Sequence, residues 1–273
     1  MEHEYLFLPV IMLFSVIQSI FGMGILVFGT PALLLLGYDF SSVLGLLLPS
    51  SVLISLTQLY TGRGWRVDRK EIFNMALCAA AVIIFLSVII ISGGRFNFDF
   101  IIGLVLIFSA VVRLSTNFRQ FISARLIKYQ RLYVLVMGAL HGVTNMGGAL
   151  LALYASTIQN EKTAIRAEVS RYYLMFGIIQ LLTLTILKPH SLSLSGFMAA
   201  PFALFVYWGV GNVLFRRASP SVYEGLLTAF IAVYGILVLT KDISDDHDYD
   251  SARSYSCHVS DCPGLYATLA QFY

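Results

Sequence analysis

Long stretches of apolar residues alternate with short polar segments along most of the chain. Six of these stretches are long enough to cross a membrane as helices, because a hydrocarbon core of about 30 Å requires about 20 helical residues. They are Ser41–Tyr60, Ile72–Ser92, Phe98–Ser115, Ile165–Leu187, Leu194–Phe215 and Val222–Thr240. The pattern predicts six membrane-spanning helices.

Two further apolar regions are interrupted near their middle by closely spaced glycines. The first region consists of Tyr5–Ile20 and Leu26–Gly37, and the second of Leu132–Val143 and Ala149–Ile158. Each piece has 10 to 16 residues, which corresponds to about 15–24 Å of helix and is too short for a full crossing. We therefore expect helices that are broken inside the membrane, which is tolerated only where protein or a cavity covers the freed backbone.

The order of these segments repeats after 123 residues. Spans that begin near residues 41, 72 and 98 recur near residues 164, 195 and 221. Residue identity contributes little to this observation, so it rests on the register of the segments. The register predicts a duplication, with a first membrane repeat at residues 1–118, a second at 119–240, and an acidic, disordered tail at 241–273.

The lysine and arginine residues help to choose a topology, because cytoplasmic loops carry an excess of them. If both broken regions cross the membrane, eleven basic residues lie on one side and five on the other, whereas the split is twelve to four if both regions are re-entrant hairpins. The second arrangement is favoured. It predicts an all-α polytopic membrane protein with two inverted repeats, each a broken, re-entrant helix pair plus three transmembrane helices. Loops 62–71 and 116–131 would then be cytoplasmic and both termini outside.

The composition supports a membrane protein and disfavours several other classes. Charged residues make up 12 % of the chain and hydrophobic residues 58 %, whereas soluble domains carry about 25 % charged residues. No nucleotide-binding glycine motif follows a strand, and the apolar segments contain no cluster of His and Cys, which disfavours an ATP-driven pump and a metalloenzyme. We expect no catalytic residue, no metal, no cofactor and no nucleic-acid partner.

The two breaks are candidates for an anion site. A helix that begins inside the membrane presents unpaired backbone N–H groups and the positive end of its dipole, and both attract anions. The helix starts at Gly24–Leu26 and Gly147–Ala149 would face each other across a pseudo-twofold axis. Glycines that only allow close helix packing are the alternative. The candidate residues at the breaks are Gln18, Gly22, Met23, Gly24, His141, Thr144, Asn145, Met146, Gly147 and Gly148.

Further candidates lie within the apolar spans, where polar side chains are costly. Arg171, with Tyr172 beside it, could bind a sulfonate or carboxylate through two parallel N–H groups, or it could extend to the membrane surface. His141, which occupies the position equivalent to Gln18, could take up a proton during transport or form a packing hydrogen bond.

Uncharged polar residues in the spans have two interpretations as well. Ser50 and Ser51 could donate hydrogen bonds to a substrate, although serines in membrane helices often bond to their own backbone. Gln58 and Gln180 lie deep in their spans, and we expect them to bridge helices.

The residues around the breaks resemble a known family. The stretch QSIFGMGIL at residues 18–26, followed by PALLLLG at 31–37, resembles the TauE/SafE family of sulfite and organosulfonate exporters, whose halves each carry a glycine-rich break followed by P-x-L-x-x-x-G. The stretch HGVTNMGGA at residues 141–149 resembles the matching repeat. The resemblance covers about residues 5–240.

This resemblance implies a secondary transporter, with export the expected direction, for small sulfur-containing or carboxylate anions such as sulfite or sulfonates. We expect the anion to bind at the membrane midplane between the two breaks, with alternating access and with H⁺ or Na⁺ as a coupling ion. The expected location is the bacterial inner membrane, and the oligomeric state stays open. The alternative is a membrane-embedded redox protein or enzyme that uses His141, or an assembly subunit without transport.

Overall fold

The computed structural model describes residues 6–62, 67–92, 125–219, 221–229, 231–233 and 235–236, together with the single positions 107, 111 and 121. Most of the span predicted at Phe98–Ser115, the end of the span predicted at Val222–Thr240 and the tail at 241–273 lie outside these residues.

The described residues form helices, with no strand among them. Four helices are long and apolar enough to cross a membrane, namely α3, α4, α9 and the continuous stretch Leu194–Arg217. The predicted all-α polytopic membrane protein is therefore confirmed. In chain order the elements are α1 (Phe7–Phe21), α2 (Ile25–Leu35), α3 (Phe40–Gly62), α4 (Arg69–Ser92), α7 (Gln130–Thr144), α8 (Gly148–Ile158), α9 (Lys162–Leu187), η2 (Pro189–Ser191), α10 (Leu194–Val206), the π-helical turn η3 (Tyr207–Gly211) and α11 (Asn212–Arg217), before a further helix at Ser221–Val233.

The first predicted break is a tight turn between α1 and α2. Gly22 ends α1 in the left-handed conformation (φ 80°), and its N–H donates to the carbonyl of Gln18 at 2.8 Å. The rings of Phe14 and Phe28 lie 5.9 Å apart, so α2 folds back along α1. A Cβ at Gly24 would lie 2.9 Å from the Phe14 carbonyl oxygen, which explains why glycine is needed here.

The second break has the same form. Asn145 ends α7 with φ 61°, and its N–H donates to the carbonyl of His141 at 2.8 Å. Tyr133 Oη, near the start of α7, donates to the carbonyl of Leu150 at 2.7 Å, so α8 folds back along α7. The starts of α1 and α7, and those of α2 and α8, are each separated by 123 residues. Both predicted breaks and their common register are therefore present.

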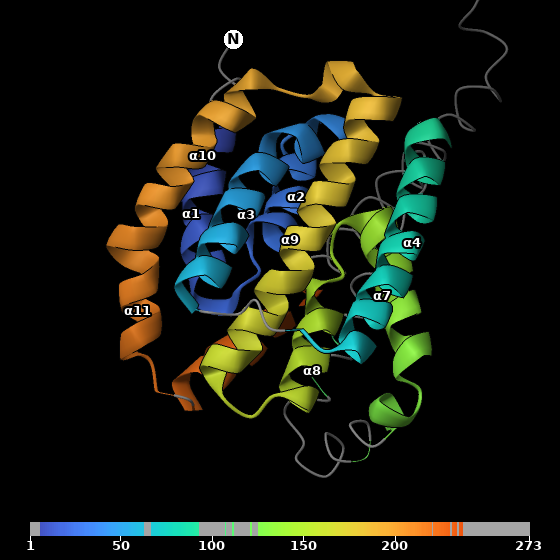
Figure 1. Cartoon of the computed structure of the whole chain (residues 1–273). Coiled ribbons are helices and arrows are strands. Elements are labelled where there is room, and N and C mark those ends of the chain that lie inside the picture. Colours follow the sequence, from blue (N-terminus) through green and yellow to red (C-terminus); the bar gives the residue numbers. More distant parts are fainter. Residues whose placement is uncertain are drawn as a thin grey trace, which may run out of the picture.

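The helices α3 and α9, which follow the two hairpins, lie side by side at the centre and run in opposite directions (Figure 1). Ser170, near the start of α9, donates to Gln58, near the end of α3, at 2.8 Å. At the other end, Lys188 donates to Ser41 at 3.2 Å. Gly177, midway along α9, lies against Val52. These contacts hold α3 and α9 together at both ends and in the middle.

Small residues allow the outer helices to approach the core closely. Gly138 and Gly142 of α7 lie against α4, where added Cβ atoms would be 2.5 Å from the Cys78 carbonyl and 2.8 Å from the Val82 carbonyl. Gly211 in η3 packs against Ser19 of α1 in the same way.

Large apolar side chains on the outer faces of α4 and α10 are exposed, which is the surface expected of a protein in lipid. They include Ile84, Val88, Ile91, Phe197, Met198 and Phe205.

Candidate functional site

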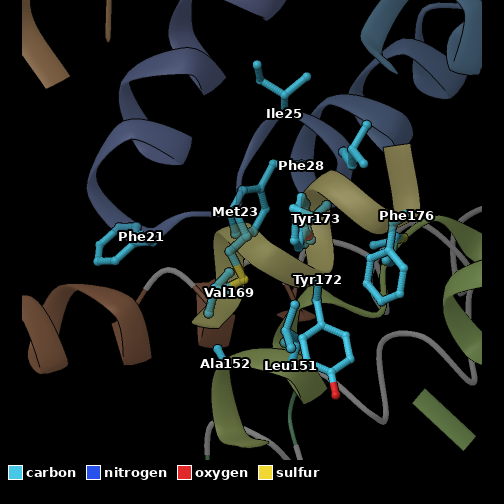
Figure 2. Packing of buried hydrophobic residues seen from close by; sticks show 14 of the residues in the cluster. Phe21, Met23, Ile25, Phe28, Leu151, Ala152, Val169, Tyr172, Tyr173 and Phe176 are labelled. Carbon is cyan, nitrogen blue, oxygen red and sulfur yellow. The ribbon is translucent and has the colours of Figure 1, made fainter. Parts of the chain in front are cut away.

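The starts of α2 and α8 meet in the core of the protein. A Cβ at Gly148 would collide with Tyr173 Oη and Val27, and it would lie 3.1 Å from Met23 Sδ. Figure 2 shows Met23 and Phe28 of the first hairpin region beside Tyr173 of α9. The two hairpins therefore touch through a glycine, because a larger residue at position 148 would separate them.

Hydrogen bonds within the protein occupy the start of α2. Gln18 Oε1 accepts from the N–H of Ile25 at 3.2 Å, the first N–H of the helix. Gln18 Nε2 donates to the carbonyl of Ser51 at 2.9 Å and contacts Ser51 Oγ at 3.0 Å and Ser55 Oγ at 3.2 Å. The amide of Gln18 thus caps the start of α2 and connects the first break to α3 by hydrogen bonds.

Gln58 and Gln180 bridge helices, as predicted from their depth in the spans. Gln58 Nε2 donates to the carbonyls of Gln18 and Ser19 at 2.8 and 3.1 Å, and its Oε1 accepts from Ser170. Gln180 Nε2 donates to Asn145 Oδ1 at 3.0 Å. Polar bridges of this kind hold α1, α3, α7 and α9 in one arrangement.

Among the described residues, no side chain caps the start of α8 as Gln18 caps the start of α2. His141 occupies the position of Gln18 in the second repeat, and its ring stacks on Phe176 at a centroid distance of 3.9 Å. The ring is fully buried and faces the side-chain amide of Gln180, but neither nitrogen makes a well-aligned hydrogen bond within the described part of the chain. A neutral imidazole has one N–H donor and one acceptor. His141 therefore has hydrogen-bonding capacity that the neighbouring amide of Gln180 satisfies at best with poor geometry.

Other buried groups near His141 also lack well-aligned partners. Tyr173 Oη, which touches Gly148, and Gln180 Oε1, which faces His141, make no well-aligned hydrogen bond among the described residues. Because buried polar groups are almost always hydrogen-bonded, a cluster of exceptions indicates a place for a ligand or water. Asn145 does not belong to this group, since its Nδ2 donates to Thr30 Oγ1 at 2.7 Å.

The remaining candidates at the breaks have structural roles. Thr144 Oγ1 donates to the Leu140 carbonyl at 2.7 Å, which is the backbone bonding common for hydroxyl residues in helices, and accepts from the Met146 N–H at 3.1 Å. Gly147 lies against His141. A Cβ added at Gly147 would be 2.7 Å from the Cβ of His141. Met23 and Met146 are buried between the hairpins.

Arg171 and Tyr172 belong to a second polar cluster and do not lie at the breaks. Arg171 forms an ion pair with Glu168 at 2.7 Å, and its side chain is 14 % exposed. Tyr172 Oη donates to Glu71 Oε1 at 2.6 Å. The cluster surrounds a cavity of about 480 Å³ near the start of α4. The structure thus divides the predicted site residues between two places.

Over residues 7–238 the chain matches the family described as Sulfite exporter TauE/SafE. The chain belongs to the TauE/SafE family. The match includes both hairpins and the antiparallel pair α3 and α9, and it confirms the resemblance found at residues 18–37 and 141–149. Neither the curated proteins nor the solved structures gave a match. As a member of this family, the TauE/SafE protein is an integral multi-pass membrane transporter.

Several residues of the TauE/SafE protein escaped prediction because their roles depend on contacts between distant helices. Tyr173 and Glu71 belong to no motif or spacing that marks them in the sequence. Glu168 had a detectable signal, since its spacing of three residues from Arg171 is typical of a helical ion pair. Arg166 is buried, where its guanidinium stacks on Phe215 at 3.5 Å and donates to a carbonyl at the end of α1.

Proposed function

We propose that this TauE/SafE protein is a secondary transporter that exports small sulfur-containing or carboxylate anions, such as sulfite or sulfonates. The observation that carries the proposal is the pair His141 and Tyr173, two buried hydrogen-bonding groups without well-aligned partners beside the start of α8. An imidazole N–H and a phenol O–H both donate to oxyanions. The positive end of the α8 dipole adds attraction without a fixed charge.

The proposed site lies at the second break alone, unlike the symmetric site that the duplication predicts. At the first break, Gln18 already accepts from the helix start and donates to Ser51. An anion there would have to displace these bonds, and the freed groups would remain buried. His141 offers the equivalent position with only a poorly aligned contact to Gln180 to displace.

The mechanism we propose is alternating access between two inverted repeats, which exposes the break to each side in turn. The antiparallel run of α3 and α9 supports inversion, because these helices hold equivalent places in the two repeats. The residues at both breaks are buried, so we interpret this arrangement as an occluded state. The basic segment before α4 would face the cytoplasm of a bacterial inner membrane.

A binding experiment on the purified protein tests the site. Thermal unfolding is measured with sulfite, an alkyl sulfonate, thiosulfate and small carboxylates, because a ligand of the folded state raises its stability by mass action. We expect His141→Ala and Tyr173→Phe to remove the shift produced by the active anion. Tyr207→Phe is the matched control, since it deletes a phenol hydroxyl that bonds to Thr61, away from the breaks. A shift that survives in both site variants would contradict the proposal.

A further inference from the structure

A cavity of about 230 Å³ lies at the end of the bundle where α3 and α11 end and α9 begins (Figure 1). Gln58, Arg166 and Asn212 line it and are buried, whereas Arg216, which also lines it, is exposed. The cavity can therefore be reached from the surface. The described residues around it include two arginines and no Asp or Glu, so the cavity attracts an anion.

Arg166 carries a buried positive charge. It is 8 % exposed, its guanidinium lies 3.5 Å from the centre of the Phe215 ring, and its Nη1 donates to the carbonyl of Ser19 at 3.0 Å. Its Nε and Nη2 make no well-aligned hydrogen bond to another described residue, and it forms no ion pair with one. Because a buried cation without a counterion is costly, Arg166 indicates a place for an anion.

Asn212 and Arg216 of α11 add further donors to the cavity. Asn212 is 8 % exposed, and its amide makes no well-aligned hydrogen bond to another described residue. Arg216 lies one helical turn further along and lines the same cavity as Arg166. Guanidinium groups bind phosphate oxygens through pairs of parallel N–H groups. This set of donors therefore suits a phosphate group.

The surface beside the cavity suits a lipid. Val213 and Leu214 of α11 are exposed, although their neighbours Asn212 and Phe215 are buried and line the cavity. Basic pockets between membrane helices bind the headgroups of anionic lipids. An anionic phospholipid would place its phosphate in the cavity and its acyl chains along the exposed side of α11. A soluble phosphate has the same chemistry and would enter past Arg216.

We propose that this cavity is a phosphate site, in which Arg166, Arg216 and Asn212 hold the phosphate group of an anionic phospholipid or of a soluble phosphate. The site is separate from the second break, and the inference does not rest on the proposed transport function. The Ser19 carbonyl that accepts from Arg166 also accepts from Gln58. A bound phosphate would therefore hold α9 and α11 against α1 and α3.

Native mass spectrometry of the protein purified in detergent tests the lipid source. Phosphatidylglycerol, which is anionic, is compared with phosphatidylcholine, which has no net charge. We expect phosphatidylglycerol to bind, and Arg216→Gln to weaken it about tenfold, the usual effect of losing one hydrogen bond from a charged group. Arg217→Gln is the matched control, because it removes the same charge from an exposed neighbour that is not among the described lining residues.

Thermal unfolding in a neutral detergent tests the soluble source, with inorganic phosphate compared with chloride at equal ionic strength. Asn212→Leu keeps the size of the side chain and removes its amide, so it should fold and bind phosphate less tightly. We expect Arg216→Gln to do the same and Arg217→Gln to respond as the wild type does. Retention of phosphatidylglycerol would identify a lipid site, and stabilisation by inorganic phosphate a site for the soluble ion.

The proposal is overturned if neither phosphatidylglycerol nor inorganic phosphate binds. It is also overturned if Arg216→Gln and Arg217→Gln weaken binding equally, because the effect would then reflect surface charge alone. His141→Ala should leave the binding of both probes unchanged, since His141 lies at the second break. Sulfonate titrations are repeated in Arg216→Gln, where a remaining thermal shift reports the second break. A wild type that binds a phosphate probe and none of the substrate anions would contradict the proposed transport function alone.

Discussion

Gln18 and His141 lie 123 residues apart at corresponding places before the two breaks, yet only Gln18 is bonded to the helix that follows its break. Gln18 Oε1 accepts from the N–H of Ile25, whereas neither nitrogen of His141 makes a well-aligned hydrogen bond within the described part of the chain. The two breaks are therefore similar in backbone and different in chemistry. This difference makes the second break the place for a ligand.

Replacing His141 by Gln should close the second break. The amide of His141→Gln can accept from the start of α8, as Gln18 does at the start of α2. We expect the protein to gain stability by about 0.5–1.5 kcal/mol, the usual net value of a buried hydrogen bond, and to lose anion binding. Thermal unfolding with and without anion measures both effects. Normal anion binding by this variant would place the substrate elsewhere.

Gly148→Ala should separate the two hairpins. The added methyl group would collide with Tyr173 Oη and Val27, and overpacking of this kind costs about 1–3 kcal/mol. We expect a lower unfolding temperature and weaker anion binding. The control is Gly209→Ala, since a Cβ at Gly209 has no neighbour within 4 Å. Equal behaviour of the two variants would argue against a tight junction at Gly148.

Gln58→Leu should destabilise the central bundle. It would leave the carbonyls of Gln18 and Ser19 and the hydroxyl of Ser170 with fewer partners. Each buried group that loses its hydrogen bond costs about 1–3 kcal/mol. Chemical or thermal unfolding measures the loss. Combination with Ser170→Ala should be non-additive because the two side chains are bonded to each other, and strictly additive losses would contradict this bond.

Arg171→Gln should leave anion affinity unchanged, because Arg171 lies in the carboxyl cluster with Glu168 and not at the breaks. Effects of distant sites that share no partners usually combine independently. Binding titrations with the anion found active in the wild type measure the affinity. A large loss of affinity in Arg171→Gln would return this guanidinium to the substrate site.

Asp39 should make stability depend on pH on the side where α3 begins. Partial burial acts to raise the pKa of Asp39, but hydrogen bonds from Ser42 and Ser41 and the charge of Lys188 outweigh it and hold the pKa below its usual value. The stabilisation is therefore present above the pKa of the unfolded chain and lost as the pH falls through the lower folded pKa. We expect Asp39→Asn to lower the unfolding temperature at neutral pH and to match the wild type in strong acid. A constant difference across the pH range would exclude this ionisation.

Much of the fold could be predicted because its signals are local. Apolar length identifies a membrane span, and glycines such as Gly22 and Gly24 mark the turn, because a glycine accepts a positive φ and close contact with backbone. The register of 123 residues predicted the equivalence of Gln18 and His141 before any contact was known. Gln58 and Gln180 are polar residues that lie deep within apolar spans, and this position was enough to predict that they bridge helices.

The site itself required the tertiary structure. Whether a buried polar side chain finds a hydrogen-bond partner depends on residues of other helices. Gln18 bonds to Ser51, 33 residues away, and Asn145 bonds to Thr30, 115 residues away. Arg171 had the properties of an anion ligand until its pairing with Glu168 was known. Sequence alone therefore determined the family, the two breaks with their spacing of 123 residues, and the described helices around them, since these follow from local hydrophobicity and backbone preference. Only the packing of the helices decided which polar groups at the breaks find partners, because hydrogen bonds depend on atoms brought within about 3 Å of each other.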